Sequence, residues 1–137
     1  MDMLLECLDA IIESQIWPEK KASEIIKILL YVQGKGYLYT SSIGKELKAV
    51  LCAYRINEGD DLTKIPLEEK GNILYVPFIV SMKKEENLFN VIRESCKIYL
   101  DNNPDIEEII LEDKNNKIKR YKLKGAEDGK RESVNTT

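Results

Sequence analysis

Few residues of this chain have the types and spacing that chemistry requires. Lys83 and Lys84 stand where an apolar segment ends and a helical pattern begins. Because the N–H groups of a helix N-terminus carry partial positive charge, adjacent lysines there would favour a phosphate or another anion. The alternative is a charged turn, since Glu85 and Glu86 follow and Asn87 is a capping candidate. The segment is a candidate anion site with an ordinary structural alternative.

Paired carboxylates further along the chain are the second feature with chemical potential. Glu107-Glu108 and Glu112-Asp113 bracket a short apolar segment, and carboxylate oxygens are ligands that Ca²⁺ and Mg²⁺ prefer. No ligand-spaced loop and no glycine turn accompanies them, so we expect solvated side chains and no metal site. The sequence has no histidine, which excludes histidine acid–base catalysis, serine–histidine–aspartate triads and the common zinc sites.

The sequence signs of nucleotide binding and of a disulfide framework are both missing. The chain has neither a G-x-x-x-x-G-K-[ST] loop nor a G-x-G-x-x-G run, which are the strongest such signs. Cys7, Cys52 and Cys96 are odd in number, far apart and each inside an apolar segment. This arrangement favours reduced core thiols over disulfides, and we therefore expect a cytoplasmic protein.

Length and charge limit the class of protein further. A chain of 137 residues suits one domain with one core. The formal net charge is -3 and the basic residues are mostly interleaved with acidic ones, which disfavours nucleic acid and anionic membranes as partners. No stretch approaches the ~20 apolar residues that span a bilayer. Residues 124–137 hold few apolar side chains, so we expect a disordered tail after a domain of residues 1–123.

Apolar periodicity predicts the elements that precede the long central strand. Leucine and isoleucine recur at helical spacing in residues 4–12, and apolar residues do so again in 22–30, which predicts two N-terminal helices. Residues 37–40 and 47–56 are strand-like runs separated around Gly44-Lys45. That pattern predicts a hairpin.

The second half of the chain alternates strand and helix patterns. A polar connection of residues 57–71 leads to the apolar run 73–82, and a helical stripe follows over residues 88–100. Segments 108–112 and 118–123 then flank a turn-rich loop, which predicts a closing hairpin. The whole order predicts an α+β domain.

The run of residues 73–82 is apolar on both faces, as in a strand that is covered on both sides. Pro77 interrupts it. Because proline cannot donate to a ladder, it belongs at a sheet edge, at a bulge or where neighbouring strands part. A central strand with a parted neighbour would offer a slot for a ligand.

This element order resembles the GNAT family of acyl-CoA-dependent acyltransferases. The run GKELKAVLCAYRI of residues 44–56 looks like that family's second strand pair, and LYVPFIV of residues 74–80 looks like its bulged fourth strand. Residues 88–100 would be the helix that covers the cofactor. The resemblance covers residues 1–112 and implies a GNAT-like mixed, mostly antiparallel sheet, with two N-terminal helices and one helix after the central strand.

The resemblance also implies a ligand and a place for it. In the family, the pantetheine arm of the acyl-CoA lies where the bulged strand leaves its neighbour, and backbone N–H groups polarise the thioester carbonyl. Here that role would fall to the backbone near Phe78, Ile79, Val80 and Ser81. Pyrophosphate binding would fall to the turn of residues 83–87, through Lys83, Lys84 and Asn87. The cofactor would be acetyl-CoA or another acyl-CoA, and the acceptor an amine or a protein.

The chain departs from the family pattern in two places. The family's Arg/Gln-x-x-Gly-x-Gly/Ala turn is absent, and residues 83–88 contain no glycine, although close backbone approach to pyrophosphate normally needs it. The family's next helix, which often supplies a tyrosine acid, has no counterpart after Leu111. Tyr75, Tyr99 and Tyr121 match no motif position, so no catalytic residue is assigned.

Three functions stay open on the sequence alone. The first is a GNAT-like domain that binds an acyl-CoA beside Pro77; were it an enzyme, it would be an acyl-CoA-dependent N-acyltransferase. The second is a catalytically degenerate structural or interaction protein, for example a component of a phage or of another multi-subunit assembly. The third is a small sensor or dimerisation module that pairs through a sheet edge or helices. A protein partner or a homodimer is therefore open as well.

Overall fold

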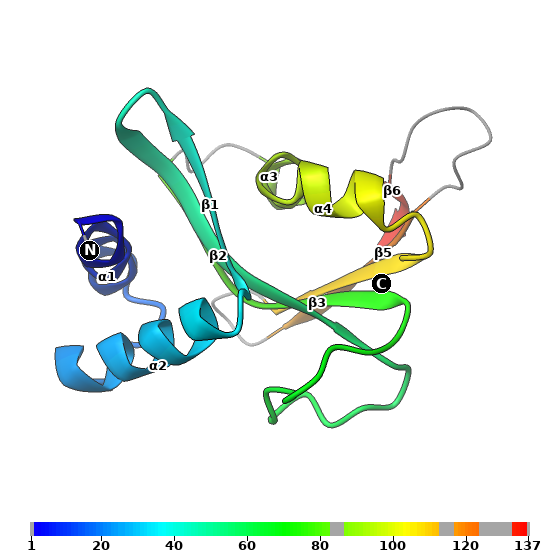
Figure 1. Cartoon of the computed structure of the whole chain (residues 1–137), viewed down its shortest axis with the longest axis horizontal. Coiled ribbons are helices and arrows are strands. Elements are labelled where there is room, and N and C mark those ends of the chain that lie inside the picture. Colours follow the sequence, from blue (N-terminus) through cyan, green and yellow to red (C-terminus); the bar gives the residue numbers. More distant parts are fainter. Residues whose placement is uncertain (1, 83–86, 113–116, 124–132, 137) are drawn as a thin grey trace. The chain divides into compact units, whose positions relative to one another are not determined.

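The computed structural model describes residues 2–82, 87–112, 117–123 and 133–136 of the chain. It is an α+β fold with two N-terminal helices before a mixed, mostly antiparallel sheet, which confirms the predicted fold class (Figure 1). The strand order is β1-β2-β3-β4-β5-β6. The elements are α1 (Asp2–Ser14), α2 (Ala22–Gly34), β1 (Leu38–Ile43), β2 (Glu46–Ile56), β3 (Ile73–Ser81), α3 (Leu88–Ser95), α4 (Lys97–Asn102), β4 (Glu108–Glu112), β5 (Ile118–Leu123) and β6 (Ser133–Thr136).

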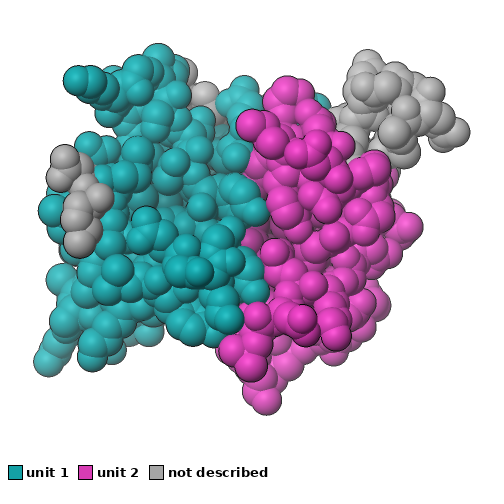
Figure 2. Space-filling model, in the orientation of Figure 1, with its two compact units in different colours: residues 1–52, 79–95 teal, residues 53–78, 96–137 magenta. Residues whose placement is uncertain are grey.

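The chain divides into two compact units, which Figure 2 colours separately. Unit 1 comprises residues 1–52 and 79–95, and unit 2 comprises residues 53–78 and 96–137. The division passes through β2 and β3, so each of these strands contributes residues to both units. The single domain of residues 1–123 stays a prediction.

Unit 1 is built on two helices and a hairpin. Helix α1 packs against α2, and α2 and α3 each contact β1, on opposite sides of that strand in the view of Figure 1. The predicted hairpin is confirmed: β1 pairs antiparallel with β2 from Leu38↔Cys52 to Ile43↔Glu46. Gly44 has a φ of 60° at the first position of the two-residue turn, a position that favours glycine in hairpins. A register shift between Ser41 and Ser42 kinks the edge strand.

Local backbone signals set both ends of α2. At its start, the carboxylate of Glu24 accepts a hydrogen bond of 3.0 Å from the N–H of Lys21. At its end, the N–H groups of Gly36 and Tyr37 donate to Gln33 and Val32 over 3.0 and 2.8 Å, the pattern of a Schellman motif with glycine in the left-handed region. Pro18 lies in the turn that precedes α2.

Unit 2 contains the only recorded parallel pairing among the described strands. Strand β3 runs parallel to β4, with the register Ile73↔Glu108 to Val76↔Leu111. A parallel pair needs a crossover connection, and α3 and α4 lie in it. The helical stripe of residues 88–100 is divided by a turn at Cys96. Strand β5 pairs antiparallel with β4, which confirms the closing hairpin.

Only part of the tail that the sequence predicts to be disordered is described by the structure. Residues 124–132 and 137 lie outside the described residues. Ser133–Thr136, however, form β6, which pairs antiparallel with β5 through Tyr121↔Thr136 and Leu123↔Ser133. The expectation of a wholly disordered tail rested on its lack of apolar side chains, but an edge strand can be held by backbone hydrogen bonds alone.

The loop of residues 57–72 is tied to the strands at both ends. Near its start, the Asp60 carboxylate accepts from the N–H of Asn57 over 2.8 Å. Asp61 accepts from the Thr63 hydroxyl over 2.6 Å and from the Thr63 N–H over 2.9 Å, and these bonds lower the pKa of Asp61. At its end, Gly71 passes close over the Ile56 backbone. The acidic run of this loop therefore braces its own backbone.

The three cysteines are all buried and none of them forms a disulfide, as predicted for core thiols. Burial raises the pKa of Cys96 to about 12. Burial, followed by the charge of Glu6, raises the pKa of Cys7 to about 11. Among the described residues no helix is long and apolar enough to cross a membrane.

Replacing Gly71 with alanine should destabilise the fold more than replacing Gly59. Both glycines have positive φ, 111° and 86°, so alanine adds backbone strain of roughly 1 to 3 kcal/mol at either position. At Gly71 the new Cβ would also lie 2.0 Å from the carbonyl oxygen of Ile56, whereas nothing lies within 4 Å at Gly59. Urea unfolding followed by circular dichroism should show the larger loss of unfolding free energy for Gly71→Ala. Equal losses would contradict the close approach.

Candidate functional site

The candidate site begins where the parallel pairing of β3 and β4 ends. The last recorded pair is Val76↔Leu111, one residue before Pro77. Because proline has no N–H, it cannot continue the ladder. Strand β3 nevertheless runs on to Ser81, while β4 ends at Glu112. The parallel pairing of β3 with β4 therefore ends just before Pro77.

A tyrosine and a carboxylate meet at this same end of the pair. The Tyr75 hydroxyl donates a hydrogen bond of 3.0 Å to Glu112 Oε2. Tyr75 is buried, and its ring meets that of Tyr54 edge to face, with centroids 5.7 Å apart. A buried phenol needs a polar partner, and here the partner is a half-buried carboxylate at the tip of β4. Such a carboxylate can bind an ammonium group or accept its proton.

The residues predicted to bind the cofactor are placed by two different parts of the chain. Phe78 belongs to unit 2, whereas Ile79, Val80 and Ser81 belong to unit 1. Phe78 and Val80 are buried, and Ile79 and Ser81 are half-buried. The side chains of this segment thus alternate between buried and half-buried positions along the strand, and the role predicted for its backbone stays a prediction.

The predicted phosphate-binding turn is described only at its last residue. Lys83 and Lys84 lie outside the described residues. Asn87 is exposed, and its Oδ1 accepts from the N–H of Phe89 over 2.8 Å. This bond makes Asn87 the N-cap of α3, the structural role that the sequence also allowed.

An ionic cluster in unit 2 holds the loop of residues 57–72 to β2. The N–H of Arg55 donates to Glu69 Oε2 over 2.9 Å, and the Arg55 guanidinium bonds Asp105 and Asn103. The Tyr99 hydroxyl donates to the same Glu69 oxygen over 3.5 Å. Burial, followed by the charge of Glu69, raises the pKa of Tyr99 to about 12. The buried Arg55 Nε has no hydrogen-bond partner among the described residues.

Three of the four carboxylates weighed as metal ligands are engaged with other protein groups, and the fourth, Asp113, lies outside the described residues. Glu107 accepts from Asn72 over 2.9 Å, and Glu112 accepts from Tyr75. Glu108 binds Arg120, which also pairs with Glu58 at 2.6 Å; these hydrogen bonds raise the pKa of Arg120. Among the described residues, no three carboxylates, thiols or imidazoles are grouped to hold a metal ion.

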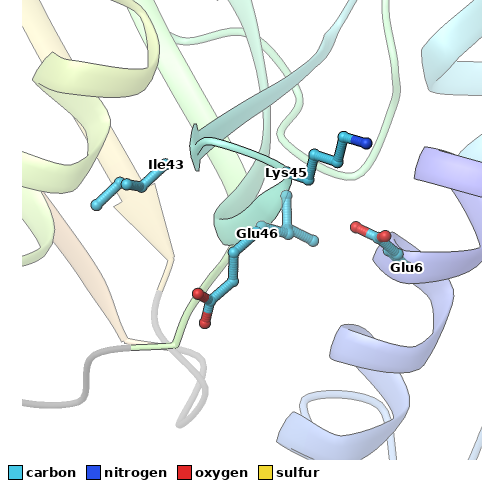
Figure 3. Close-up of a pocket in the computed structure, with 5 residues that line it drawn as sticks. Glu6, Ile43, Lys45 and Glu46 are labelled. Carbon is cyan, nitrogen blue, oxygen red and sulfur yellow. The ribbon is translucent and has the colours of Figure 1, made fainter.

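A separate hollow of about 570 Å³ lies on unit 1 and opens to solvent (Figure 3). Its lining comes from α1 and from the β1–β2 turn: Glu6, Ile43, Lys45, Glu46 and Leu47. No motif of the sequence predicts a function for any of these side chains. A lysine beside glutamates gives it charge of both signs.

Sequence reasoning missed the Tyr75–Glu112 pair and the cluster around Arg55. The partners of Arg55 lie 14 to 50 residues away along the chain, so no spacing rule connects them. One signal was present. Arg55 follows an apolar run within β2 and stands one residue before the end of that strand, and a charged side chain in that position requires a partner.

No protein-family model, no curated protein and no solved structure matches this chain. Functional inference therefore rests on the geometry and on the sequence pattern.

Replacing Glu69 with glutamine should lower the pKa of Tyr99. Glu69 contributes to raising that pKa through its charge and its hydrogen bond, and both act against loss of the phenol proton. The titration of Tyr99 can be isolated by subtracting the tyrosinate absorbance of Tyr99→Phe from that of the parent chain. Glu68→Gln is the matched control, because Glu68 is the adjacent, largely exposed carboxylate.

The raised pKa of Tyr99 also predicts how the free energy of unfolding changes at high pH. The pKa of Tyr99 is about 12 in the folded chain against an ordinary 10.0, so the folded state keeps this proton longer than the unfolded state does. The resulting stabilisation is complete below pH 10 and is lost as the pH rises towards 12. A Tyr99 that titrates like an exposed tyrosine would contradict its burial beside Glu69.

Proposed function

We propose that this chain is a GNAT-like domain that binds an acyl-CoA beside Pro77. The observation that carries the proposal is the parallel pairing of β3 with β4, whose recorded register ends one residue before Pro77. Antiparallel pairing of these strands would have argued against it. The α+β element order around the pair is the second support.

The proposed mode of binding uses backbone rather than side chains. An extended pantetheine arm carries amides that can pair with the N–H and C=O groups of a strand backbone, much as a peptide adds to a sheet edge. In this proposal the backbone of residues 78–81 takes that role, and one of its N–H groups polarises the thioester carbonyl.

Binding of the cofactor phosphates would depend on attraction to lysine charges more than on close contact with the backbone. The turn lacks the glycines that let a backbone approach pyrophosphate, and the Asn87 amide oxygen is already used to cap α3. Lys83 and Lys84 would then supply most of the attraction. Such binding is weaker than that of a glycine-rich loop and falls with ionic strength.

No residue is assigned to receive the acceptor amine. If acyl transfer occurs, the amine nitrogen attacks the thioester carbonyl, the carbon–sulfur bond breaks, the CoA thiolate leaves, and the ammonium proton passes to a base. Acylation of a panel of amines by the bound acyl-CoA distinguishes an enzyme from a domain that only binds.

Calorimetric titration with acetyl-CoA tests the proposal directly. We expect saturable heat, and about tenfold weaker binding by the double variant Lys83→Glu/Lys84→Glu, because two attractive charges become repulsive. The control is Lys20→Glu/Lys21→Glu, since this lysine pair also directly precedes a helix, α2. The control should bind like the parent chain.

The absence of heat at millimolar acetyl-CoA would overturn the proposal. Equal weakening by both double variants would also count against it, because it would show attraction to general charge. In either case the non-catalytic structural or interaction protein, weighed from the sequence, becomes the better account.

A further inference from the structure

The exposed face around the hollow of unit 1 combines apolar side chains with charge. Ile43, at the end of β1, lines the hollow and is 65% exposed. Exposed large apolar side chains next to a concave, partly charged surface are typical of an interaction site.

Two opposite charges line this hollow from different elements. Figure 3 shows Glu6 on α1 and Lys45 on the β1–β2 turn reaching toward the same space. Within the described residues neither makes an ion pair, whereas Glu46 beside them pairs with Lys48 at 3.2 Å. The hollow therefore offers one acidic and one basic group to whatever covers it.

We propose that a second copy of this chain covers the face formed by Glu6, Ile43 and Lys45. In a twofold contact the same patch meets itself, so residue i faces residue j and the reverse contact is also made. A patch that carries both signs satisfies that condition: Glu6 faces Lys45 of the second copy, and Lys45 faces Glu6 of the second copy. A wholly acidic or wholly basic partner would leave one of the two groups facing a like charge.

The contact is made by side chains rather than by extension of the sheet. Strand β1 is at the edge of the sheet, and the register shift in its pairing with β2 is a β-bulge, a feature that discourages edge-to-edge pairing. The exposed turn and α1 are left to form the contact. Since few residues are involved, the dimer is weak and depends on concentration. The proposal is independent of acyl-CoA binding.

Sedimentation equilibrium of the full chain, from micromolar to millimolar concentration, tests the proposal. We expect a reversible monomer–dimer equilibrium. Glu6→Lys and Lys45→Glu should each weaken dimerisation about tenfold, because each places like charges together twice across the twofold axis. The double variant Glu6→Lys/Lys45→Glu exchanges the two signs, so it should return the dimerisation constant to near that of the parent chain.

Two further variants separate this contact from general charge and from misfolding. Lys64→Glu makes the same charge change at an exposed position of unit 2 and should leave dimerisation unchanged. Ile43→Ser should weaken dimerisation equally at low and high salt, whereas the effects of the charge variants should shrink at high salt. Circular dichroism of each variant checks that it is folded.

Three outcomes would overturn the proposal: a monomer at every concentration, single charge variants no weaker than Lys64→Glu, or a double variant that fails to recover. Acetyl-CoA binding by a strictly monomeric chain would overturn this dimer and leave the proposed function intact. Dimerisation without acetyl-CoA binding would do the reverse.

Discussion

The parallel pairing of β3 with β4 is the constraint on which much of the remaining structure depends. Two parallel neighbours cannot be joined by a tight turn. After β3 the chain must therefore return to the end of the sheet at which β3 began before it can form β4. Helices α3 and α4 fill that connection. Strand β3 is buried at all four paired positions, Ile73 to Val76, as expected for a strand covered on both faces. The apolar run that dominates the sequence is a consequence of this topology.

The end of the β3–β4 pairing also explains why a proline is tolerated at position 77. A proline inside a fully paired central strand would leave a neighbouring carbonyl without its donor. Here the recorded ladder ends just before it. The Tyr75–Glu112 hydrogen bond joins the two strands through side chains at the end of the recorded register. Polar groups are thus concentrated where the strands stop pairing.

The sequence predicted the elements better than it predicted their contacts. The helix of residues 22–30 and the hairpin around Gly44 follow from local signals, because a period of 3.6 and a turn glycine act over a few residues. The break at Cys96 was not predictable, since the apolar stripe continues across it. Strand β6 was missed because its pairing with β5 is made by backbone, which leaves no side-chain pattern.

The candidate site was predictable only as a location. Pro77 in an apolar strand indicated where a ladder would end. The partners of Tyr75 and Arg55 depend on which distant segments the topology brings together, and a single sequence does not contain that information. The net charge of -3 could be read from the sequence, but the positions of individual charges could not. It does not reveal that Glu6 and Lys45 line one hollow.

The three buried thiols can report local opening of the chain through their reaction rates. A thiol reagent attacks the thiolate, and burial both hides Cys7 and Cys96 and raises their pKa. Each can therefore react only during the short time in which its surroundings open, so its labelling rate reports the free energy of that opening. Cys7 and Cys52 belong to unit 1 and Cys96 to unit 2. Peptide-resolved labelling would thus show whether the two units open together or in separate events, with no probe added to the sequence.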